Sequence, residues 1–586
     1  MDQTEEGAAV RPVPDGSVRR AAAVSTAGDE GAAAGSPLAA PEGRGGFSVS
    51  LPAGVDRLFD SVNRWDTAMR HRWPFKAIVG PDIDPASVAG DGSRLLVRPA
   101  VMGFVGLVAV AAGASQPQSP FALKLPGSWF FGVPAAGAHS STGGLFLGLV
   151  AVYGGLLLLM RAWFSMTRTL ASVPGVPVRS VALVLALWCI PMLVAPPLFS
   201  HDVYSYAAQG EMMSHHISPY RFGPNVLGQG APFQRLVDQI WGNAPAPYGP
   251  LFLQIDGFIV TLTMHNELAA VVLLRLLELG GVVLLAFGIP SLARSYGRDA
   301  SAVFALAVLN PVVILHLVGG AHNDALMLGF LVVGIAAARR GRPVVGIVLC
   351  TLGTAIKAPA AIGVLYIGWT WLGAGVPWRQ RIRPVVSAGA IALALMALLS
   401  MAAGLGWGWV GNLATPGTVT SWLAPATGVG LLLTHMVHGV GIHIAGHYIR
   451  SLTRVTGLLG AAVAGIWLLW NVDRFGTLRA MGATLVLVVV LGPVVQPWYL
   501  SWGFVMLAPV ASARLRPWLV GLSMATAFIG LPGGRQLIGE LPGHPATIAV
   551  ALLALLFILT VPLTPLGRSA HGPASPADDD LVALPR

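Results

Sequence analysis

The sequence predicts an all-α polytopic membrane protein. Only 11% of its 586 residues are charged and 54% are hydrophobic, whereas about a quarter of the residues of a soluble domain are charged. The mean hydropathy is +0.69. Runs of Leu, Val, Ala and Gly recur along most of the chain, each close to the ~20 residues that a helix needs to cross a bilayer. We therefore expect about 13–15 transmembrane helices in the plasma membrane.

The predicted spans follow one another along most of the chain. In chain order they are 99–115, 145–160, 180–198, 268–290, 301–318, 324–338, 343–357, 360–375, 384–404, 455–471, 481–496, 499–512, 517–531 and 545–563. Two further apolar stretches are weaker. We expect 426–440 to be re-entrant or interfacial, and Leu251–Leu262, which is short and carries Asp256, to be interfacial.

The two ends of the chain differ from its middle. Met1–Gly46 is rich in Ala, Gly, Pro and acidic residues and has no apolar core or signal peptide, so we expect a disordered cytoplasmic tail. This tail opens an N-terminal cytoplasmic region, 1–94. A transmembrane domain is expected over 95–563, followed by a second disordered tail, 564–586.

The distribution of Arg and Lys predicts that the N-terminus is cytoplasmic. Fifteen Arg fall in the connections that would then be internal: Arg161, Arg168, Arg179, Arg294, Arg298, Arg339, Arg340, Arg342, Arg379, Arg381, Arg383, Arg474, Arg479, Arg514 and Arg516. The net charge of +10 is thus explained by membrane topology and does not indicate nucleic-acid binding. The segments Gln116–Gly144, Ser200–Glu267 and Leu405–Pro425 are predicted to be external, and the functional site is expected there.

The first of the candidate functional stretches is "SHDVYSYAAQG", which follows the apolar run Val181–Phe199. In a helix, Asp202, Tyr206 and Gln209 share one face. Partial desolvation would raise the pKa of Asp202 and suit it to accept a proton. Alternatively, Asp202 is simply the N-cap of the helix 203–213.

Two cations lie within or beside apolar runs, where charges are costly and often functional. Lys357 in "GTAIKAPA" is placed where a leaving phosphate could be stabilised, although snorkelling to the interface would also explain it. Arg275 is three residues before Glu278, so an intrahelical ion pair is the alternative to a functional role.

The stretch "GGAHNDALML" places His322, Asn323 and Asp324 between two spans. Asp324 could be a helix cap. His322 has no partner at the spacing of a metal site, and neither the pair His215/His216 nor the pair His435/His438 forms a metal pattern, so no metal site is predicted.

Aromatic residues at the predicted external boundaries suit sugar binding. They include Tyr248 in "NAPAPYGPLFL", Trp407 and Trp409 in "GWGWVGNLATPGTVTSW", and Trp498 beside Gln496 in "QPWYLSWG". Trp at a membrane border is also an ordinary interfacial anchor, and for Trp407 and Trp409 we favour that interpretation.

Together, "SHDVYSYAAQG", "ISPYRFGP", "APYGPLFL", "LNPVVILHLVGGAHNDALMLG", "AIKAP" and "PVVQPWYLSW" resemble the actinobacterial polyprenol-phosphate-mannose-dependent α-(1→6)-mannosyltransferases, in particular the MptB-like members, over roughly Arg94–Val561. The resemblance implies a GT-C fold with an active site on the outer face. It also implies a polyprenyl-phosphate-mannose donor and a mannan or phosphatidylinositol-mannoside glycolipid acceptor, as in lipomannan and lipoarabinomannan synthesis. It implies no cofactor and leaves open any need for a divalent metal.

The resemblance also suggests roles for individual residues. Asp202 matches the catalytic acid of the first large outer loop, with His201 where relatives carry a basic or polar residue. The predicted donor-phosphate ligands are Lys357, Arg275 and Arg221. The predicted acceptor- or sugar-binding residues are His201, Tyr204, Tyr206, Gln209, Tyr220, Tyr248, His322, Asn323, Asp324, Gln496 and Trp498.

Two other functions remain open from the residues alone. A GT-C transferase could use another sugar, such as arabinose or glucose, or could mannosylate protein. A lipid-linked sugar flippase or transporter would instead place charges near the bilayer midplane and often shows inverted repeats. The polar residues here gather towards one predicted face, and no inverted repeat is evident, which favours an enzyme.

Overall fold

The computed structural model describes residues 92–117, 119, 121–122, 129–132, 141–418, 423–442 and 444–528, all within the compact unit Asp60–Arg586. Every regular element in these residues is helical and none is a strand, which confirms the all-α prediction. The predicted tails Met1–Gly46 and 564–586 and the predicted span 545–563 lie outside the described residues.

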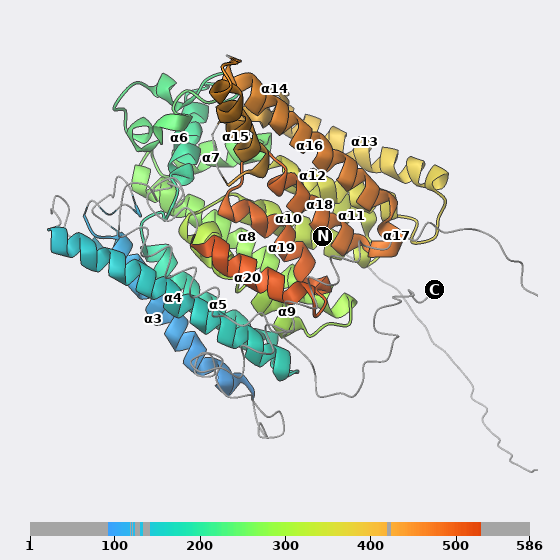
Figure 1. Ribbon diagram of the computed structural model, residues 1–586, viewed down its shortest axis with the longest axis horizontal. Coiled ribbons are helices and arrows are strands. Elements are labelled where there is room, and N and C mark those ends of the chain that lie inside the picture. The colour runs from blue at the N-terminus through green and yellow to red at the C-terminus, as the bar shows by residue number, and fades with distance from the viewer. Residues whose placement is uncertain are drawn as a thin grey trace, which may run out of the picture. The chain divides into compact units, whose positions relative to one another are not determined.

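The α-helices, labelled in Figure 1, are α3 (Val97–Ala114), α4 (Thr142–Ser172), α5 (Val178–Val194), α6 (Asp202–Ser214), α7 (Pro250–Leu262), α8 (Glu267–Ser295), α9 (Ala300–Ala307), α10 (Asp324–Arg339), α11 (Pro343–Thr354), α12 (Ala361–Thr370), α13 (Trp378–Ala402), α14 (Gly408–Gly411), α15 (Pro425–Gly439), α16 (Gly446–Trp470), α17 (Val472–Phe475), α18 (Thr477–Val490), α19 (Ser501–Leu507) and α20 (Leu515–Ala527). Short turns of other helix types are η2 (Gly92–Leu96), η3 (Phe130–Gly132), η4 (Pro224–Leu227), η5 (Phe233–Leu236), η6 (Gln239–Trp241), η7 (Val313–Gly319, a π-helix), η8 (Ala358–Ala360), η9 (Asn412–Thr418), η10 (Pro497–Leu500) and η11 (Ala508–Val510).

Several of these helices are long and apolar enough to cross a membrane. Within the described residues there are five, formed by η2 with α3, by most of α4, and by α8, α13 and α16. A sixth is counted if η7 and α10, which are bent by 115° at a short break, form one span. Shorter apolar helices, among them α5, α7, α11 and α18, lie between them. The chain is therefore polytopic, and the number of 13–15 spans stays a prediction.

The helices pack in two kinds of surroundings. α3 lies against α4 and α5, and α10 lies between α8 and α11 (Figure 1). By contrast, α13 and α16 bury little of their length and expose apolar side chains such as Leu393 and Val463. An apolar surface of this kind suits contact with lipid, because lipid tails offer no hydrogen-bond partners and apolar side chains need none.

Some predicted boundaries are wrong. The predicted span 145–160 belongs to a longer helix, α4, so Arg161 and Arg168 lie within a helix and not in a loop. The predicted span 301–318 is broken after Ala307 and resumes as the π-helix η7. An apolar run predicts burial in lipid or protein but does not reveal such a break.

The predicted span 499–512 is also interrupted, because a 3-10 turn lies on either side of the short helix α19, one that begins at Pro497 and one that contains Pro509. The weaker run 426–440 forms the continuous helix α15, packed on α16, and Leu251–Leu262 lies in α7, packed on α6.

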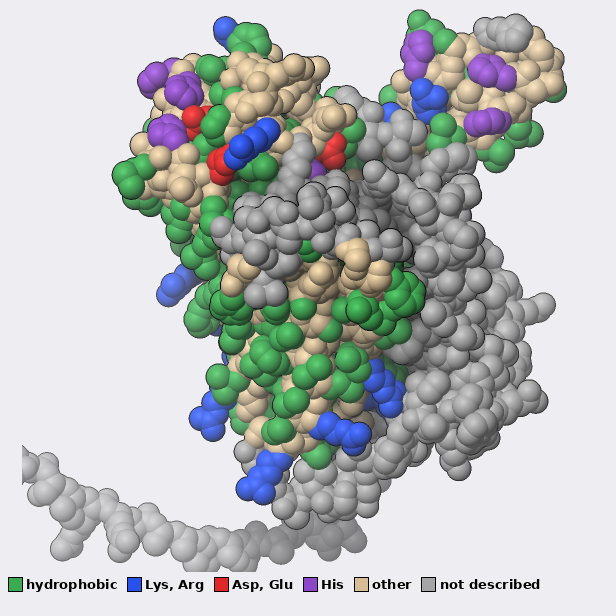
Figure 2. Space-filling view, turned by 90° about the vertical axis from the view of Figure 1, so that its left-hand side faces the viewer, with side chains coloured by type: hydrophobic (Ala, Val, Ile, Leu, Met, Phe, Trp, Pro, Cys, Tyr) green, Lys and Arg blue, Asp and Glu red, His purple; other side chains and the backbone are tan. Residues whose placement is uncertain are grey.

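Charge is distributed unevenly over the surface. On the face drawn in Figure 2, the charged side chains at the lower end are Lys and Arg, whereas the acidic side chains and the histidines gather at the upper end together with a few further Lys and Arg. This segregation is the pattern expected when opposite ends of a bundle face opposite sides of a membrane.

Candidate active site

The stretches that carry the resemblance converge in three dimensions. Their polar and aromatic side chains form one group, which we call the Asp202–Lys357 cluster. Its members are Asp202, Tyr206, Tyr248, His322, Asn323, Asp324, Lys357, Trp498, Tyr499 and Trp502. They come from the start of α6, the turn before α7, the bend between η7 and α10, the start of η8, and η10 with α19.

Asp202 is the first residue of α6, and the N-cap position belongs to His201, whose side chain makes no capping hydrogen bond. The interpretation of Asp202 as a cap is therefore wrong. Its backbone N–H donates to Ser200 Oγ at 3.1 Å. Its carboxylate Oδ2 lies 3.4 Å from Nδ1 of His322, and 18% of the side chain remains exposed. The carboxylate is thus free of helix capping and partly accessible.

The expected rise in the pKa of Asp202 does not occur. Burial acts to raise the pKa of this carboxyl, as the sequence suggested, but contact with His322 and the positive charge of Lys357 outweigh burial. The hydrogen bond to Ser200 adds to them, so the pKa lies below its usual value. Asp202 is therefore an ionised carboxylate at neutral pH.

His322 is fixed by its surroundings. It is fully buried and its ring stacks on Trp498, with 3.7 Å between the centroids and 17° between the planes. The residues that lead into the pair, Phe199 before Asp202 and Ala321 before His322, both have positive φ, at 64° and 53°. Such backbone strain in residues other than glycine is found preferentially at functional sites.

Lys357 is held by an acid, an amide and aromatic rings. Its Nζ donates to Asp324 Oδ2 at 2.7 Å and to Asn323 Oδ1 at 3.2 Å. The ring centroids of Tyr499, Tyr248 and Trp502 lie 4.8, 5.8 and 5.8 Å from Nζ. With 12% of its side chain exposed, Lys357 is not a snorkelling anchor. An ammonium has three N–H groups, so one remains for a ligand.

Asp324 has a partner on each of its two carboxylate oxygens. Besides Lys357, it accepts a hydrogen bond from Trp502 Nε1 at 2.5 Å, and it is fully buried. It is the first residue of α10, and no side chain caps this helix. Its role is therefore to hold Lys357 in place and not to cap a helix.

Backbone pairing explains why Tyr248 and Lys357 meet. The N–H groups of Gly249 and Leu251 donate to the carbonyls of Ile356 and Ala355, at 3.0 and 3.1 Å. A Cβ on Gly249 would lie 2.3 Å from the Ala355 carbonyl oxygen, so only glycine allows this approach. The pairing ties "APYGP" to "AIKAP", although more than a hundred residues separate them.

Three phenols line the cluster. Tyr206 packs edge-on against Tyr248 with centroids 5.1 Å apart, and Tyr499 stacks on Trp502 at 4.7 Å. Burial raises the pKa values of the Tyr206, Tyr248 and Tyr499 phenols well above the usual value of a phenol, and the charges of Asp202 and Asp324 raise them further. The phenols are therefore neutral and can donate hydrogen bonds.

Several buried polar atoms of the cluster have no hydrogen-bond partner in the part of the chain that the structure describes. They are Nδ1 and Nε2 of His322, Nδ2 of Asn323, Nε1 of Trp498 and the hydroxyl oxygen of Tyr206. An unmade hydrogen bond at a buried atom costs about 1–3 kcal/mol, so such atoms are usually satisfied by a ligand or water. A ligand with several hydroxyl groups would satisfy them.

Arg275 lies apart from the cluster's acid and ammonium. Its Nη1 donates to the carbonyls of Leu193 and Ala195 at 3.1 and 2.6 Å, and its Nη2 donates to the carbonyl of Gly319 at 3.1 Å. We call this arrangement the Arg275 clamp. The predicted ion pair with Glu278 is absent from the described residues, because Glu278 Oε2 instead accepts the Leu326 N–H at 3.1 Å. The clamp joins the segment before Asp202 to the segment before His322.

The other predicted residues are spread around the cluster. Tyr204 is buried beside His201, with ring centroids 5.9 Å apart, and Gln209 is buried on α6. Tyr220 donates from its hydroxyl to the Tyr248 carbonyl at 2.9 Å and so supports Tyr248. Arg221 is exposed on the loop after α6, and Gln496 is half-buried at the start of η10.

Sequence reasoning missed Tyr499 and Trp502, the residues that flank Lys357 together with Tyr248. The available signal was their position in the same stretch as Trp498, one and four residues further on. It also missed that His215, for which no metal pattern was predicted, lies beside Glu211 and His265 in a group that could hold a metal ion.

Two protein families match most of this chain. Residues 100–373 match the family described as α-(1→6)-mannopyranosyltransferase, N-terminal domain, and residues 425–560 match the MptB C-terminal domain. The chain belongs to the α-(1→6)-mannopyranosyltransferase family. This confirms the resemblance predicted from the sequence motifs, and the matched regions include every member of the Asp202–Lys357 cluster.

Relatives in this α-(1→6)-mannopyranosyltransferase family cover most of the chain. It is 32% identical to α-(1→6)-mannopyranosyltransferase A of Mycobacterium tuberculosis over 75% of this chain and 85% of the relative. It is 34% identical to a probable α-(1→6)-mannopyranosyltransferase of Mycolicibacterium smegmatis over 74% of this chain and 84% of the relative. It is 33% identical to α-(1→6)-mannopyranosyltransferase B of Corynebacterium glutamicum over 60% and 62%. No solved structure matches.

Proposed function

We propose that the chain is an inverting glycosyltransferase of the GT-C type, which moves mannose from polyprenyl-phosphate-mannose to the 6-hydroxyl of an α-(1→6)-mannan acceptor. The names of the relatives support the mannosyl group and the linkage. The single observation that carries the proposal is the cluster itself. An ionised, partly accessible carboxylate at Asp202 lies close to a partly buried ammonium at Lys357, within a wall of aromatic rings.

In the proposed reaction, the oxygen of the acceptor 6-hydroxyl attacks the anomeric carbon of the donor mannose. The new bond joins that oxygen to that carbon, and the bond from the carbon to the phosphate oxygen breaks. Asp202 accepts the hydroxyl proton, and the electron pair leaves with the polyprenyl phosphate. One displacement turns a β-linked donor into an α-linked product. General-base catalysis of this kind contributes about 10²–10⁴-fold.

His322 would orient the base. Its Nδ1 faces Asp202 Oδ2 at 3.4 Å, and the stack on Trp498 limits rotation of its ring. Holding the carboxylate in one orientation directs its free oxygen at the acceptor. Positioning of this type lowers the entropy cost of reaction.

Lys357 would offset the charge that grows on the departing phosphate. A fixed cation aimed at developing charge acts strongly in a site with little water. The fixed partners Asn323 and Asp324 hold the ammonium in advance. Because Arg275 is engaged with backbone carbonyls and Arg221 is exposed on a loop, we no longer propose either as a donor ligand.

The sugar would be held by the polar atoms that lack partners and by the aromatic wall. His322 Nε2, Asn323 Nδ2 and Trp498 Nε1 supply hydrogen-bonding atoms, and the phenols of Tyr206 and Tyr248 are neutral donors. A mannan or mannosylated phosphatidylinositol offers the matching hydroxyls. Mannose is preferred over arabinose or glucose because of the names of the relatives, since no contact here distinguishes these sugars.

We further propose that the N-terminus is cytoplasmic and that the cluster opens to the outer face of the plasma membrane. The Arg distribution supports this orientation. A cysteine placed at the exposed residue Gln229, on the loop after α6, should react with a membrane-impermeant maleimide in intact cells. The native Cys189 and Cys350 are buried and supply the background control. Labelling only after cell lysis would reverse the proposed orientation.

The function is tested with the purified full chain, radiolabelled polyprenyl-phosphate-mannose and a short α-(1→6)-mannoside. We expect the mannoside to be lengthened by α-(1→6)-linked mannose, with no transfer from a nucleotide-linked mannose. Parallel reactions with lipid-linked arabinose and glucose test the sugar. Movement of label across sealed vesicles without extension would support the alternative function, a lipid-linked sugar transporter, and would overturn the transferase.

A further inference from the structure

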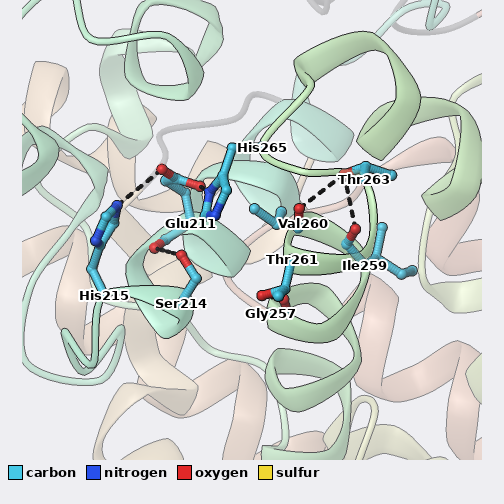
Figure 3. Close-up of polar contacts among 9 residues, drawn as sticks. All are labelled: Glu211, Ser214, His215, Gly257, Ile259, Val260, Thr261, Thr263 and His265. Carbon is cyan, nitrogen blue, oxygen red and sulfur yellow. Dashed lines mark hydrogen bonds and ion pairs between the residues drawn. The ribbon is translucent and has the colours of Figure 1, made fainter.

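A second group of chemically active side chains lies at the far end of α6 from Asp202. We call it the Glu211 triad. Glu211 is in the last turn of α6, His215 is the C-cap of that helix, and His265 lies in the turn between α7 and α8. Figure 3 shows the two imidazoles on either side of the Glu211 carboxylate. The proposed transfer reaction uses none of these residues.

The distances within the Glu211 triad are short. His215 Nε2 lies 3.0 Å from Glu211 Oε1, and His265 Nδ1 lies 2.7 Å from Glu211 Oε2. One ligand atom from each residue lies within 4.8 Å of the others. When zinc binds nitrogen and oxygen ligands at about 2.0–2.2 Å in tetrahedral geometry, these atoms are about 3.3 Å apart. The triad therefore needs only small side-chain movements to enclose an ion.

The ligand types fit a divalent transition metal. Two imidazoles and one carboxylate form the donor set of many zinc sites that keep a fourth position for water. His215 and His265 are 56% and 46% exposed, whereas Glu211 is 15% exposed. An ion can therefore reach the imidazoles from solvent while the carboxylate is held against the protein. The carboxylate would also supply a negative charge to offset part of the charge of the ion.

The fold brings His265 to this position through an unusual turn. Met264 and His265 both have positive φ, at 51° and 60°, and the His265 N–H donates to the Val260 carbonyl at 3.0 Å. The next residue, Asn266, caps α8 by accepting the Ala269 N–H at 2.9 Å. This tight connection leaves the His265 ring directed back at α6 (Figure 3).

We propose that Glu211, His215 and His265 bind one divalent transition-metal ion, with zinc as the ion that the ligands fit best, and that the ion ties the end of α6 to the α7–α8 turn. The site is separate from the Asp202–Lys357 cluster. Its ligands come from two segments about fifty residues apart, so an ion bound only to the folded state stabilises the packing of α6 on α7.

The test uses the full chain purified in detergent without a polyhistidine tag, stripped with chelator and then titrated with zinc chloride. We expect one zinc ion per chain by calorimetry, and a rise in the midpoint of thermal unfolding as zinc is added. Cobalt(II) should give the visible absorption of a four-coordinate site. The readouts are binding and unfolding, so they do not depend on the proposed transferase activity.

Substitution separates the triad from unspecific binding by other histidines. His265→Ala, His215→Ala and Glu211→Gln should each weaken zinc binding by at least about 10-fold and remove the thermal shift. The matched control is His216→Ala, the exposed neighbour of His215, which should bind as the unmodified chain does. Absence of one-to-one binding by the unmodified chain, or equal binding by the His265→Ala and His216→Ala chains, would overturn the proposal and leave the triad as a hydrogen-bonded surface group.

Discussion

Two cations sit in apolar surroundings in this molecule, and their partners differ in kind. Lys357 donates to the side chains of Asp324 and Asn323, faces three aromatic rings and keeps part of its side chain accessible. Arg275 is fully enclosed and donates to the backbone carbonyls of Leu193, Ala195 and Gly319. From the sequence, both were candidates to bind the same phosphate.

The difference shows that the hydrogen-bond partners of a cation in apolar surroundings distinguish a structural role from a role in ligand binding. The hydrogen bonds that Arg275 makes all go to carbonyls from separate segments, and its remaining Nε is buried without a partner among the described residues. Such a cation is a cross-link, because its removal takes a donor away from each of those carbonyls. A cation whose partners leave one donor towards an accessible, aromatic-lined space is available to a ligand. We therefore propose that the Arg275 clamp stabilises the backbone that carries Asp202 and His322, and that Lys357 takes part in the reaction.

The largest loss of turnover is expected on substitution of Asp202, which belongs to the same cluster as Lys357. Asp202→Asn keeps the shape of the side chain but removes the base, so turnover in the mannoside-extension assay should fall by about 10²–10⁴-fold, with unchanged thermal unfolding. The matched control is Asp256→Asn. Asp256 is fully buried, more so than Asp202, on α7, which packs against α6, but it lies outside the cluster. Near-normal turnover of the Asp202→Asn enzyme would remove Asp202 from the mechanism.

Lys357→Met should reduce turnover by about 10²-fold, as removal of one electrostatic stabiliser does in other enzymes. The substitution also leaves Asp324 buried without its partner, which costs about 3–5 kcal/mol. The double variant Lys357→Met/Asp324→Asn removes both charges and should recover thermal stability without recovering activity. Recovery of activity in the double variant would show that Lys357 only neutralises Asp324.

Arg275→Met should act mainly on stability. The Leu193 and Ala195 carbonyls that lose their donor each destabilise the fold by about 1–3 kcal/mol, whereas the Gly319 carbonyl still accepts the Leu198 N–H. We expect a lower midpoint of thermal unfolding in detergent and a smaller loss of turnover per folded molecule than for Lys357→Met. If the Arg275→Met enzyme unfolded at an unchanged midpoint but bound polyprenyl-phosphate-mannose more weakly, Arg275 would be a phosphate ligand and its contrast with Lys357 would be wrong.

The sequence predicted the all-α membrane fold and most members of the cluster because each of these depends on short-range patterns. Apolar runs report spans directly, and Asp202, His322 and Lys357 lie in compact motifs. It did not predict how far α4 extends, because the helix continues past Arg161 although the hydropathy falls there. Nor did it predict the break after Ala307, because the apolar run continues across it.

Contacts between distant segments were beyond the sequence. Arg275 pairs with three carbonyls and not with Glu278 because of where α5 and η7 end, and no local sequence pattern predicts those positions. The same is true of the Glu211 triad, since His265 reaches α6 through a turn with two residues at positive φ. The sign of the pKa shift at Asp202 likewise depended on knowing that His322 and Lys357 lie near it.

The smallest expected effect is on the pH dependence of kcat/KM, which should differ between the Lys357 and Arg275 variants. The pKa of Asp202 is lowered in the folded protein, so its carboxylate is ionised at all pH values above the ordinary value of about 3.9. Its contribution to stability is present above that value and is lost as the pH falls through the lowered pKa. The specificity constant kcat/KM should therefore be flat from about pH 7 down to about pH 5. Because Lys357 contributes to the lowering, the pKa of Asp202 should be higher in the Lys357→Met enzyme. The residual activity of that enzyme should therefore start to fall at a higher pH on acidification (its acid limb), whereas the acid limb of the Arg275→Met enzyme should not shift. An acid limb near pH 6.5 in the unmodified enzyme would instead be typical of an imidazole and would make His322 the base.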